Sequence, residues 1–159
     1  IYMLHSIGNA HQNWIYNFLS VKKSHLELLF RHFKYKKIKT LFLSEILNKN
    51  NSNQVCLSFD DGFADNWIHL FPLLIKYQIK ATIFINPEFI SDSEILRNLN
   101  PEKPCTGYLN WAEITEMQKS GLVDFQSHSM SHTWYFTSNK IIDYYLPMAF
   151  KSLNYKQYP

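Results

Sequence analysis

Two pairs of polar side chains in this sequence could together bind a metal ion. Asp60 and Asp61 are adjacent and precede Gly62, and His128 and His132 are four residues apart. Carboxylate oxygens and imidazole nitrogens are ligands of divalent metals such as zinc, and a catalytic site leaves a coordination position open for water or substrate. One carboxylate can therefore bind an ion together with the two imidazoles, while the other stays free.

Each pair taken alone has an ordinary structural explanation. Asp-Asp-Gly is also typical of a simple turn, because Asp and Gly are favoured turn residues. Two histidines at this spacing can instead lie on the surface or be hydrogen-bonded in the core. The pairs gain weight from their positions, because each follows an apolar run that reads as a β-strand. In α/β proteins the carboxyl ends of the strands face the ligand site, so we expect the two pairs to meet there.

Five short apolar runs are the expected strands of the fold. The segments between them are long enough to hold helices, which favours an α/β fold with parallel strands. The expected strands are Ile1–Leu4, Thr40–Leu43, Val55–Phe59, Ala81–Ile85 and Leu122–Gln126.

Three helices are expected between these strands, over residues 24–35, 64–77 and 110–121. Ser24 is a suitable N-cap for the first helix. Pro72 predicts a kink or an early break in the second, because proline has no backbone N–H to donate. Asn110 and Glu113 form an N-cap and N3 pair at the start of the third, and Gly121 is expected to end it.

Composition narrows the class of protein. The chain of 159 residues is 46% hydrophobic and 18% charged, which fits one globular domain or part of one. The net charge of +3 comes from scattered lysines rather than a dense basic block, so we expect no nucleic-acid partner. No apolar run is long enough to span a membrane as a helix. Aromatic residues make up 16% of the chain and could stack on sugar rings, although most such residues fill cores.

The two motifs, in this order and setting, resemble those of the polysaccharide deacetylase family, also called the NodB-homology or carbohydrate esterase family 4 domain. The family's first motif is a strand ending in (T/S)-F-D-D-G, here residues 58–62, and its second is H-(S/T)-x-x-H, here residues 128–132. The likeness extends over about residues 1–134. It implies a distorted (β/α) barrel that is incomplete at its C-terminus, with residues 1–159 forming the N-terminal portion of a single domain.

The resemblance also implies a reaction and a role for each motif residue. Asp60 would act as the general base, and Asp61, His128 and His132 would bind a divalent ion, most often Zn²⁺. The implied activity is metal-dependent hydrolysis of N-acetyl groups from the amino sugars of a cell-envelope polysaccharide. The expected partner is therefore an N-acetylated amino-sugar glycan.

Three further side chains are expected near such a substrate. His5 is placed at the rim of the pocket, and Trp111 and Trp134 against a sugar ring. A hydrogen-bonded structural histidine and ordinary core packing are the alternatives for these residues. The resemblance favours the cell envelope or another extracytoplasmic location, whereas the start at Ile1 shows no basic region of a signal peptide.

The family's later motifs have no counterpart in this sequence. They supply an arginine that orients the base and a histidine that acts as the general acid, but no His or Arg follows His132. The simplest explanation is a missing C-terminal part. A divergent enzyme could instead use another acid, for which the candidates are Tyr135, Asp143, Tyr144 and Tyr145.

Two other functions remain open at this level. One is a catalytically inactive carbohydrate-binding module with the same fold. The other is a de-N-acetylase of lipid-linked or lipopolysaccharide sugars, which differs only in its substrate.

Overall fold

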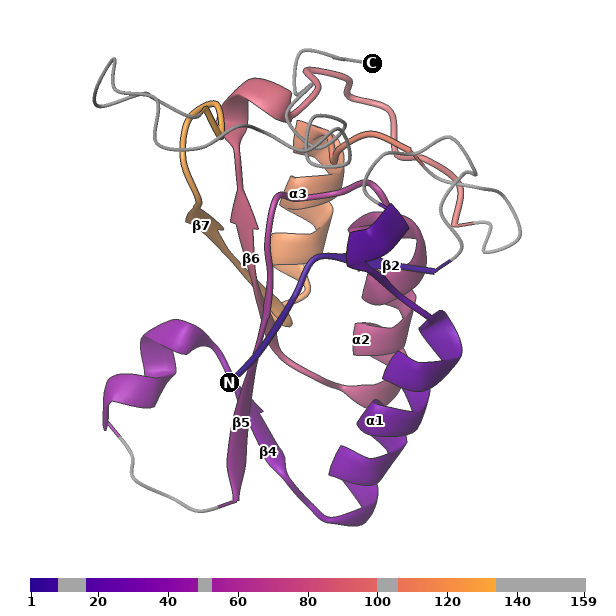
Figure 1. The fold of residues 1–159 in the computed structure, drawn as a ribbon, viewed down its shortest axis with the longest axis vertical. Helices are drawn as coiled ribbons and strands as arrows, with labels where there is room; N and C mark the ends of the chain where they lie inside the picture. Colours follow the sequence, from indigo (N-terminus) through magenta and orange to yellow (C-terminus); the bar gives the residue numbers. More distant parts are fainter. Residues whose placement is uncertain (9–16, 49–52, 100–105, 134–159) are drawn as a thin grey trace, which may run out of the picture.

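A parallel β-sheet forms the centre of the protein in the computed structural model, which describes residues 1–8, 17–48, 53–99 and 106–133 (Figure 1). The strands follow the order β1-β5-β6-β7, with β4 also paired to β5. Each predicted strand is present, with ends that differ by at most two residues. Their bounds are β1 (Tyr2–Leu4), β4 (Lys39–Leu41), β5 (Gln54–Phe59), β6 (Ala81–Ile85) and β7 (Val123–Ser127). A second, two-stranded sheet pairs β2 (Ser6–Ile7) with β3 (Ser20–Val21).

Strand β5 lies at the heart of this sheet. Its first half pairs with β4, and its second half pairs with β1 and β6. Every residue from Val55 to Phe59 is buried. A parallel strand covered on both faces reads as a continuous apolar run, which explains why the sequence predicted this strand accurately.

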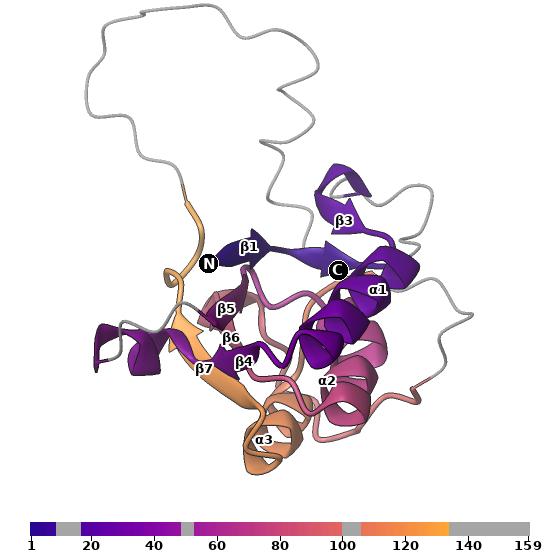
Figure 2. The same ribbon diagram turned by 90° about the horizontal axis from the view of Figure 1, so that it is seen from below.

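The α-helices of the described residues lie along one side of the sheet, as Figure 2 shows. They are α1 (Lys23–Tyr35), α2 (Phe71–Tyr77) and α3 (Trp111–Lys119). Short helical turns complete the structure at Asn17–Leu19, Leu43–Asn48, Asn66–Leu70 and Pro87–Phe89. No helix within the described ranges is both long and apolar enough to cross a bilayer.

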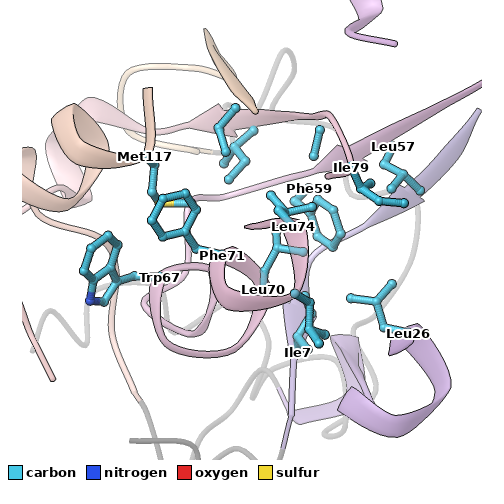
Figure 3. Packing of buried hydrophobic residues seen from close by; sticks show 14 of the residues in the cluster. Ile7, Leu26, Leu57, Phe59, Trp67, Leu70, Phe71, Leu74, Ile79 and Met117 are labelled. Atoms are coloured by element: carbon cyan, nitrogen blue, oxygen red, sulfur yellow. The ribbon is translucent and has the colours of Figure 1, made fainter. Parts of the chain in front are cut away.

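The core fills the space between the helices and the sheet (Figure 3). Apolar side chains from α1, α2 and the turn before α2 pack against β5 and β6 there. The labelled members are Ile7, Leu26, Leu57, Phe59, Trp67, Leu70, Phe71, Leu74, Ile79 and Met117. Burial of this apolar surface fixes the sheet and therefore the positions of the strand ends.

The first two helices begin differently from the prediction. Helix α1 begins at Lys23 with Lys22 at the N-cap position, so Ser24 lies inside the first turn and does not cap it. The chain enters α1 almost directly from β3, which moves the start forward. The expected helix over residues 64–77 begins with a π-helical turn, Asn66–Leu70, that passes into α2. Pro72 lies in the first turn of α2, directly after the π-helical turn. The irregularity predicted from Pro72 is therefore present as that wider turn.

The third helix follows the prediction closely. The Asn110 side chain accepts a hydrogen bond from the Glu113 N–H at 2.9 Å, and the Asn110 N–H donates to the Glu113 carboxylate at 3.1 Å. These two bonds form the predicted capping box. Gly121 follows the helix with a φ of 70°, a conformation that glycine adopts without strain.

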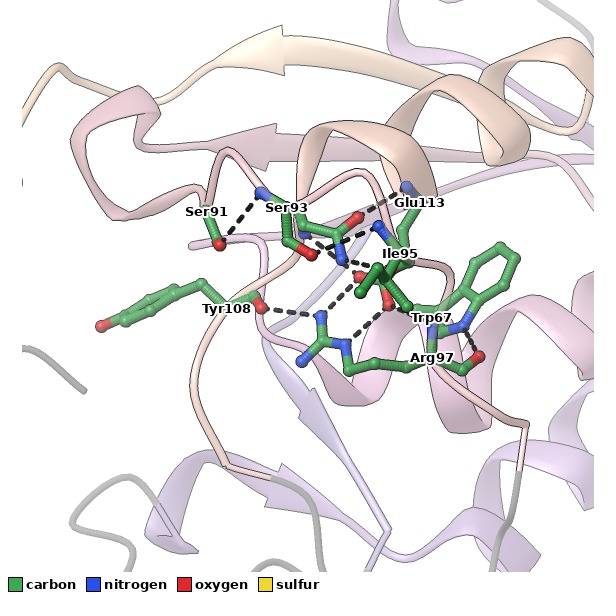
Figure 4. Close-up of polar contacts among 8 residues, drawn as sticks. Trp67, Ser91, Ser93, Ile95, Arg97, Tyr108 and Glu113 are labelled. Atoms are coloured by element: carbon green, nitrogen blue, oxygen red, sulfur yellow. Dashed lines mark hydrogen bonds and ion pairs between the residues drawn. The ribbon is translucent and has the colours of Figure 1, made fainter.

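A partly buried ion pair ties the irregular segment before α3 to the rest of the fold (Figure 4). The Arg97 guanidinium donates two hydrogen bonds to the Glu113 carboxylate, which is fully buried, and one to the Tyr108 carbonyl at 2.8 Å. The Trp67 indole N–H donates to the Arg97 carbonyl at 2.7 Å. Arg97 is thus committed to holding loops together.

Candidate metal centre

Polar residues follow four neighbouring strands at the same edge of the sheet. His5 follows β1, Asp60 and Asp61 follow β5, Asn86 follows β6, and His128 follows β7. Because these strands are parallel, their carboxyl ends lie side by side. The polar groups therefore come from segments that are far apart in the sequence.

Three of these side chains surround a common point. The Asp61 Oδ1 atom lies 3.6 Å from the His128 Nε2 atom and 3.5 Å from the His132 Nε2 atom. One potential ligand atom from each residue lies within 4.8 Å of the others. Ligand atoms about 2.1 Å from a tetrahedral zinc ion lie roughly 3.4 Å apart, so the two separations fit a shared ion.

A tight turn aims the Asp61 carboxylate at the two imidazoles. Asp61 and Gly62 have φ angles of 73° and 68°, in the left-handed region. A Cβ atom at position 62 would lie 2.9 Å from the Ile85 Cγ2 atom, so a side chain there would meet strand β6. Glycine at position 62 therefore allows the chain to turn within contact distance of β6.

A hydrogen-bonded network that sequence reasoning missed holds two of these residues, Asp61 and His132. The Asn86 amide donates a long hydrogen bond of 3.4 Å to the Asp61 Oδ1 atom, and its oxygen accepts from the Ser129 hydroxyl at 2.8 Å. The Ser129 oxygen in turn accepts from the His132 backbone N–H at 2.9 Å. Asn86 is fully buried. Its position directly after β6, at the edge that carries the other polar residues, is the signal that could have identified it.

Asp60 is not one of the three converging groups but lies beside them. Burial raises the pKa of its carboxyl, while the positive charges of His5, His128 and His132 lower it and the negative charge of Asp61 raises it. Among these charges His5 has the largest effect. The site thus contains one buried carboxylate outside the candidate ligand set, with imidazoles around it.

The other expected substrate contacts differ in position. His5 is partly buried and within electrostatic range of Asp60. The Trp111 side chain is 42% exposed and lines a hollow between α3 and residues 92–96, none of which belongs to the group around Asp61. Trp134 lies outside the described residues, and so do the candidate acids Tyr135, Asp143, Tyr144 and Tyr145.

Two known proteins with similar sequences both carry the name of a deacetylase. The chain is 30% identical over 135 residues to a poly-beta-1,6-N-acetyl-D-glucosamine N-deacetylase from Staphylococcus aureus, covering 77% of this chain and 44% of that protein. It is also 30% identical over 84 residues to the putative polysaccharide deacetylase YxkH of Bacillus subtilis, covering 53% of this chain and 25% of the relative. The chain therefore spans less than half the length of both relatives.

Solved structures show the same fold. The crystal structure of a polysaccharide deacetylase from Bacillus cereus superposes with a TM-score of 0.67 at 25% identity, over 83% of this chain and 39% of that one. IcaB from Ammonifex degensii superposes with a TM-score of 0.64 at 17% identity, over 84% of this chain and 54% of its own, and supports the fold alone.

A family assignment follows from these matches. The sequence model of the polysaccharide deacetylase family matches residues 47–145, which is more than half of the chain. This range contains both the Asp-Asp-Gly motif and the histidine pair. The α/β fold of the polysaccharide deacetylase type and the resemblance noted in the sequence are thus confirmed, and the chain belongs to the polysaccharide deacetylase family.

Proposed function

We propose that this chain forms the metal-binding part of an enzyme that hydrolyses N-acetyl groups from amino sugars of a cell-envelope polysaccharide. The observation that carries the proposal is the convergence of Asp61, His128 and His132 beside the buried carboxylate of Asp60. The printed name of the Staphylococcus aureus relative, an N-deacetylase of an N-acetylglucosamine polymer, supports the substrate class.

Asp61, His128 and His132 are proposed to hold the ion, and Zn²⁺ is the proposed metal, because catalytic zinc sites include sets of two imidazoles and one carboxylate. When bound, a divalent ion supplies Lewis-acid polarisation of the acetamide carbonyl and makes water more acidic. The chain's own contribution is to fix the three donor atoms within range of one another before the ion arrives. Asn86 and Ser129 assist by restraining Asp61 and His132.

Asp60 is proposed to be the general base. Its carboxylate can accept the proton of the attacking water while the other three side chains remain committed to the ion. The positive charge of His5 lowers the pKa of Asp60 and so favours the ionised carboxylate, which a base requires, against the opposing effect of burial.

The sequence predicted only that His5 lies at the rim of the pocket. We propose in addition that His5 donates a proton to the departing amine. Among the described residues, it is the imidazole that affects Asp60 most strongly and that lies outside the metal set. Imidazole is the side chain that most often transfers protons in general acid–base catalysis. The proposed acid therefore lies in the N-terminal strand region.

Zinc binding tests the ligand set. We expect the full-length protein to bind about one zinc ion, and His128→Ala or His132→Ala to abolish that binding, because each removes one of three donors. Isothermal titration with zinc measures the affinity. The matched control is His25→Ala, which removes an exposed imidazole from α1 and should leave binding unchanged. Absence of zinc binding by the wild-type protein would refute the proposal.

Acetate release from acetylated amino-sugar oligomers tests the base. Asp60→Asn preserves the shape of the side chain but removes its basicity, so we expect turnover to fall by at least about 100-fold while zinc still binds. Undiminished turnover would exclude Asp60 as the base. Glycan binding without acetate release by the zinc-loaded wild-type protein would instead identify a carbohydrate-binding module.

Loss of the Asn86 amide tests the support of the ligands. We expect Asn86→Ala to weaken zinc binding by about 10- to 100-fold, because hydrogen bonds to metal ligands fix their orientation. Asn53→Ala is the control, since its amide donates at 2.9 Å to the Lys37 carbonyl in an exposed loop. Equal zinc affinities of the two variants would show that Asn86 has no part in the site.

A further inference from the structure

Four consecutive residues at the start of the chain are bonded to the segment that follows β5. The Leu4 carbonyl accepts from the Asp60 N–H at 2.9 Å, and the His5 carbonyl accepts from the Asn66 amide at 3.1 Å. The Ser6 hydroxyl and the Ile7 backbone N–H both donate to the Asp65 carboxylate. The backbone on both sides of His5 is therefore attached to the Asp-Asp-Gly motif and to the residues just beyond it.

His5 lies between two strands and belongs to neither of them. Strand β1 ends at Leu4 and pairs with β5, whereas β2 begins at Ser6 and pairs with β3. Its own carbonyl is held by the Asn66 side chain. The backbone at His5, whose imidazole is within electrostatic range of Asp60, is thus held in part by a side-chain contact.

Asp65 and Asn66 are buried to an extent that is unusual for such polar residues. They are 4% and 0% exposed, and the Asn66 amide also donates to the Asp65 Oδ1 atom at 2.8 Å. The Asn66 amide nitrogen thus donates to two acceptors, the His5 carbonyl and the Asp65 carboxylate, which fixes the orientation of this side chain. No lysine or arginine within the described ranges forms an ion pair with Asp65.

This arrangement has an energetic cost. Burial raises the pKa of Asp65 to about 6, and hydrogen bonds from Ser6, Asn66 and the Ile7 N–H oppose that shift. At neutral pH the carboxyl is mainly an ionised acceptor, so the three donors offset part of its desolvation. Burial of a carboxylate costs more free energy than burial of an apolar side chain, which points to a role beyond packing. Asn66 also begins the π-helical turn, a feature often found at functional sites.

We propose that Asp65 and Asn66 form a clamp that positions the His5 imidazole beside Asp60 for the reaction. The inference rests on the proposed function and adds two positioning residues to it, since neither one belongs to the candidate metal set. A displacement of about 1 Å in a reacting group can reduce turnover by about 100-fold, so a clamp of this kind affects the rate strongly.

The kinetic test uses Asn66→Ala in the full-length, zinc-loaded protein. We expect kcat for acetate release to fall by about 10- to 100-fold, with KM and zinc affinity within about twofold of wild type. Thr40→Val is the matched control, because it removes a buried hydroxyl that accepts from the Lys80 N–H at the opposite end of the sheet. Its kcat should be unchanged. An unaltered kcat in Asn66→Ala would overturn the clamp.

A double variant separates positioning from general damage. In a His5→Ala background, Asn66→Ala should cause little further loss of kcat, because the group that it positions is already absent. A further loss as large as that in the wild-type background would overturn the proposal, since the effect would then not act through His5.

A measurement on zinc-free protein keeps the clamp testable if Asn66→Ala does not fold or if the wild type releases no acetate. The probe is the NMR signal of the His5 ring in Asp65→Asn and Ser6→Ala, which retain or nearly retain the side-chain shape. We expect this signal to shift or broaden in both variants while that of His25 stays unchanged. An unaltered His5 signal in both would refute the clamp, whereas absence of acetate release alone would refute only the proposed function.

Discussion

The alignment of β5, β6 and β7 in one register is the constraint on which the site depends. Ile83 in β6 pairs with Phe59 on one side and with Phe125 on the other, so the three strands are in step. Asp61 lies two residues beyond Phe59, and His128 lies three residues beyond Phe125. A slip of one residue in either pairing would move one set of side chains along the sheet and turn it to the other face. The hydrophobic core that fixes this register therefore also fixes the candidate metal centre.

The site concentrates features that oppose folding. Two adjacent carboxylates are largely buried, and a non-glycine residue, Asp61, has a left-handed backbone conformation. Each feature costs free energy, and such costs persist where the surrounding structure over-determines the conformation. Here that structure consists of the β5–β6–β7 register, the Gly62 contact with Ile85 and the Asn86–Ser129 network. The same reasoning applies to the clamp around His5, where a carboxylate is buried among hydrogen-bond donors.

The sequence predicted what local patterns determine. Continuous apolar runs indicated β5 and β6, and the capping pair Asn110 and Glu113 indicated the start of α3. The order of the two motifs after separate strands indicated the family. Contacts between distant segments were not predictable in this way. Asn86, Ser129, Asp65 and Asn66 follow no periodic pattern, and only the folded chain brings each to its partner. The start of α1 was misplaced because the short strand β3, which leads into it, is too brief to leave a pattern.

Membership of the polysaccharide deacetylase family makes metal-assisted hydrolysis the reaction to test, and the central claim is that one ion lies between Asp61, His128 and His132. Anomalous diffraction at the zinc absorption edge, on crystals of the zinc-loaded full-length protein, tests it most directly. The account predicts an anomalous peak within about 2.0–2.2 Å of one Asp61 carboxylate oxygen and of an imidazole nitrogen of each histidine. Zinc bound elsewhere, with no peak between these three side chains, would contradict it.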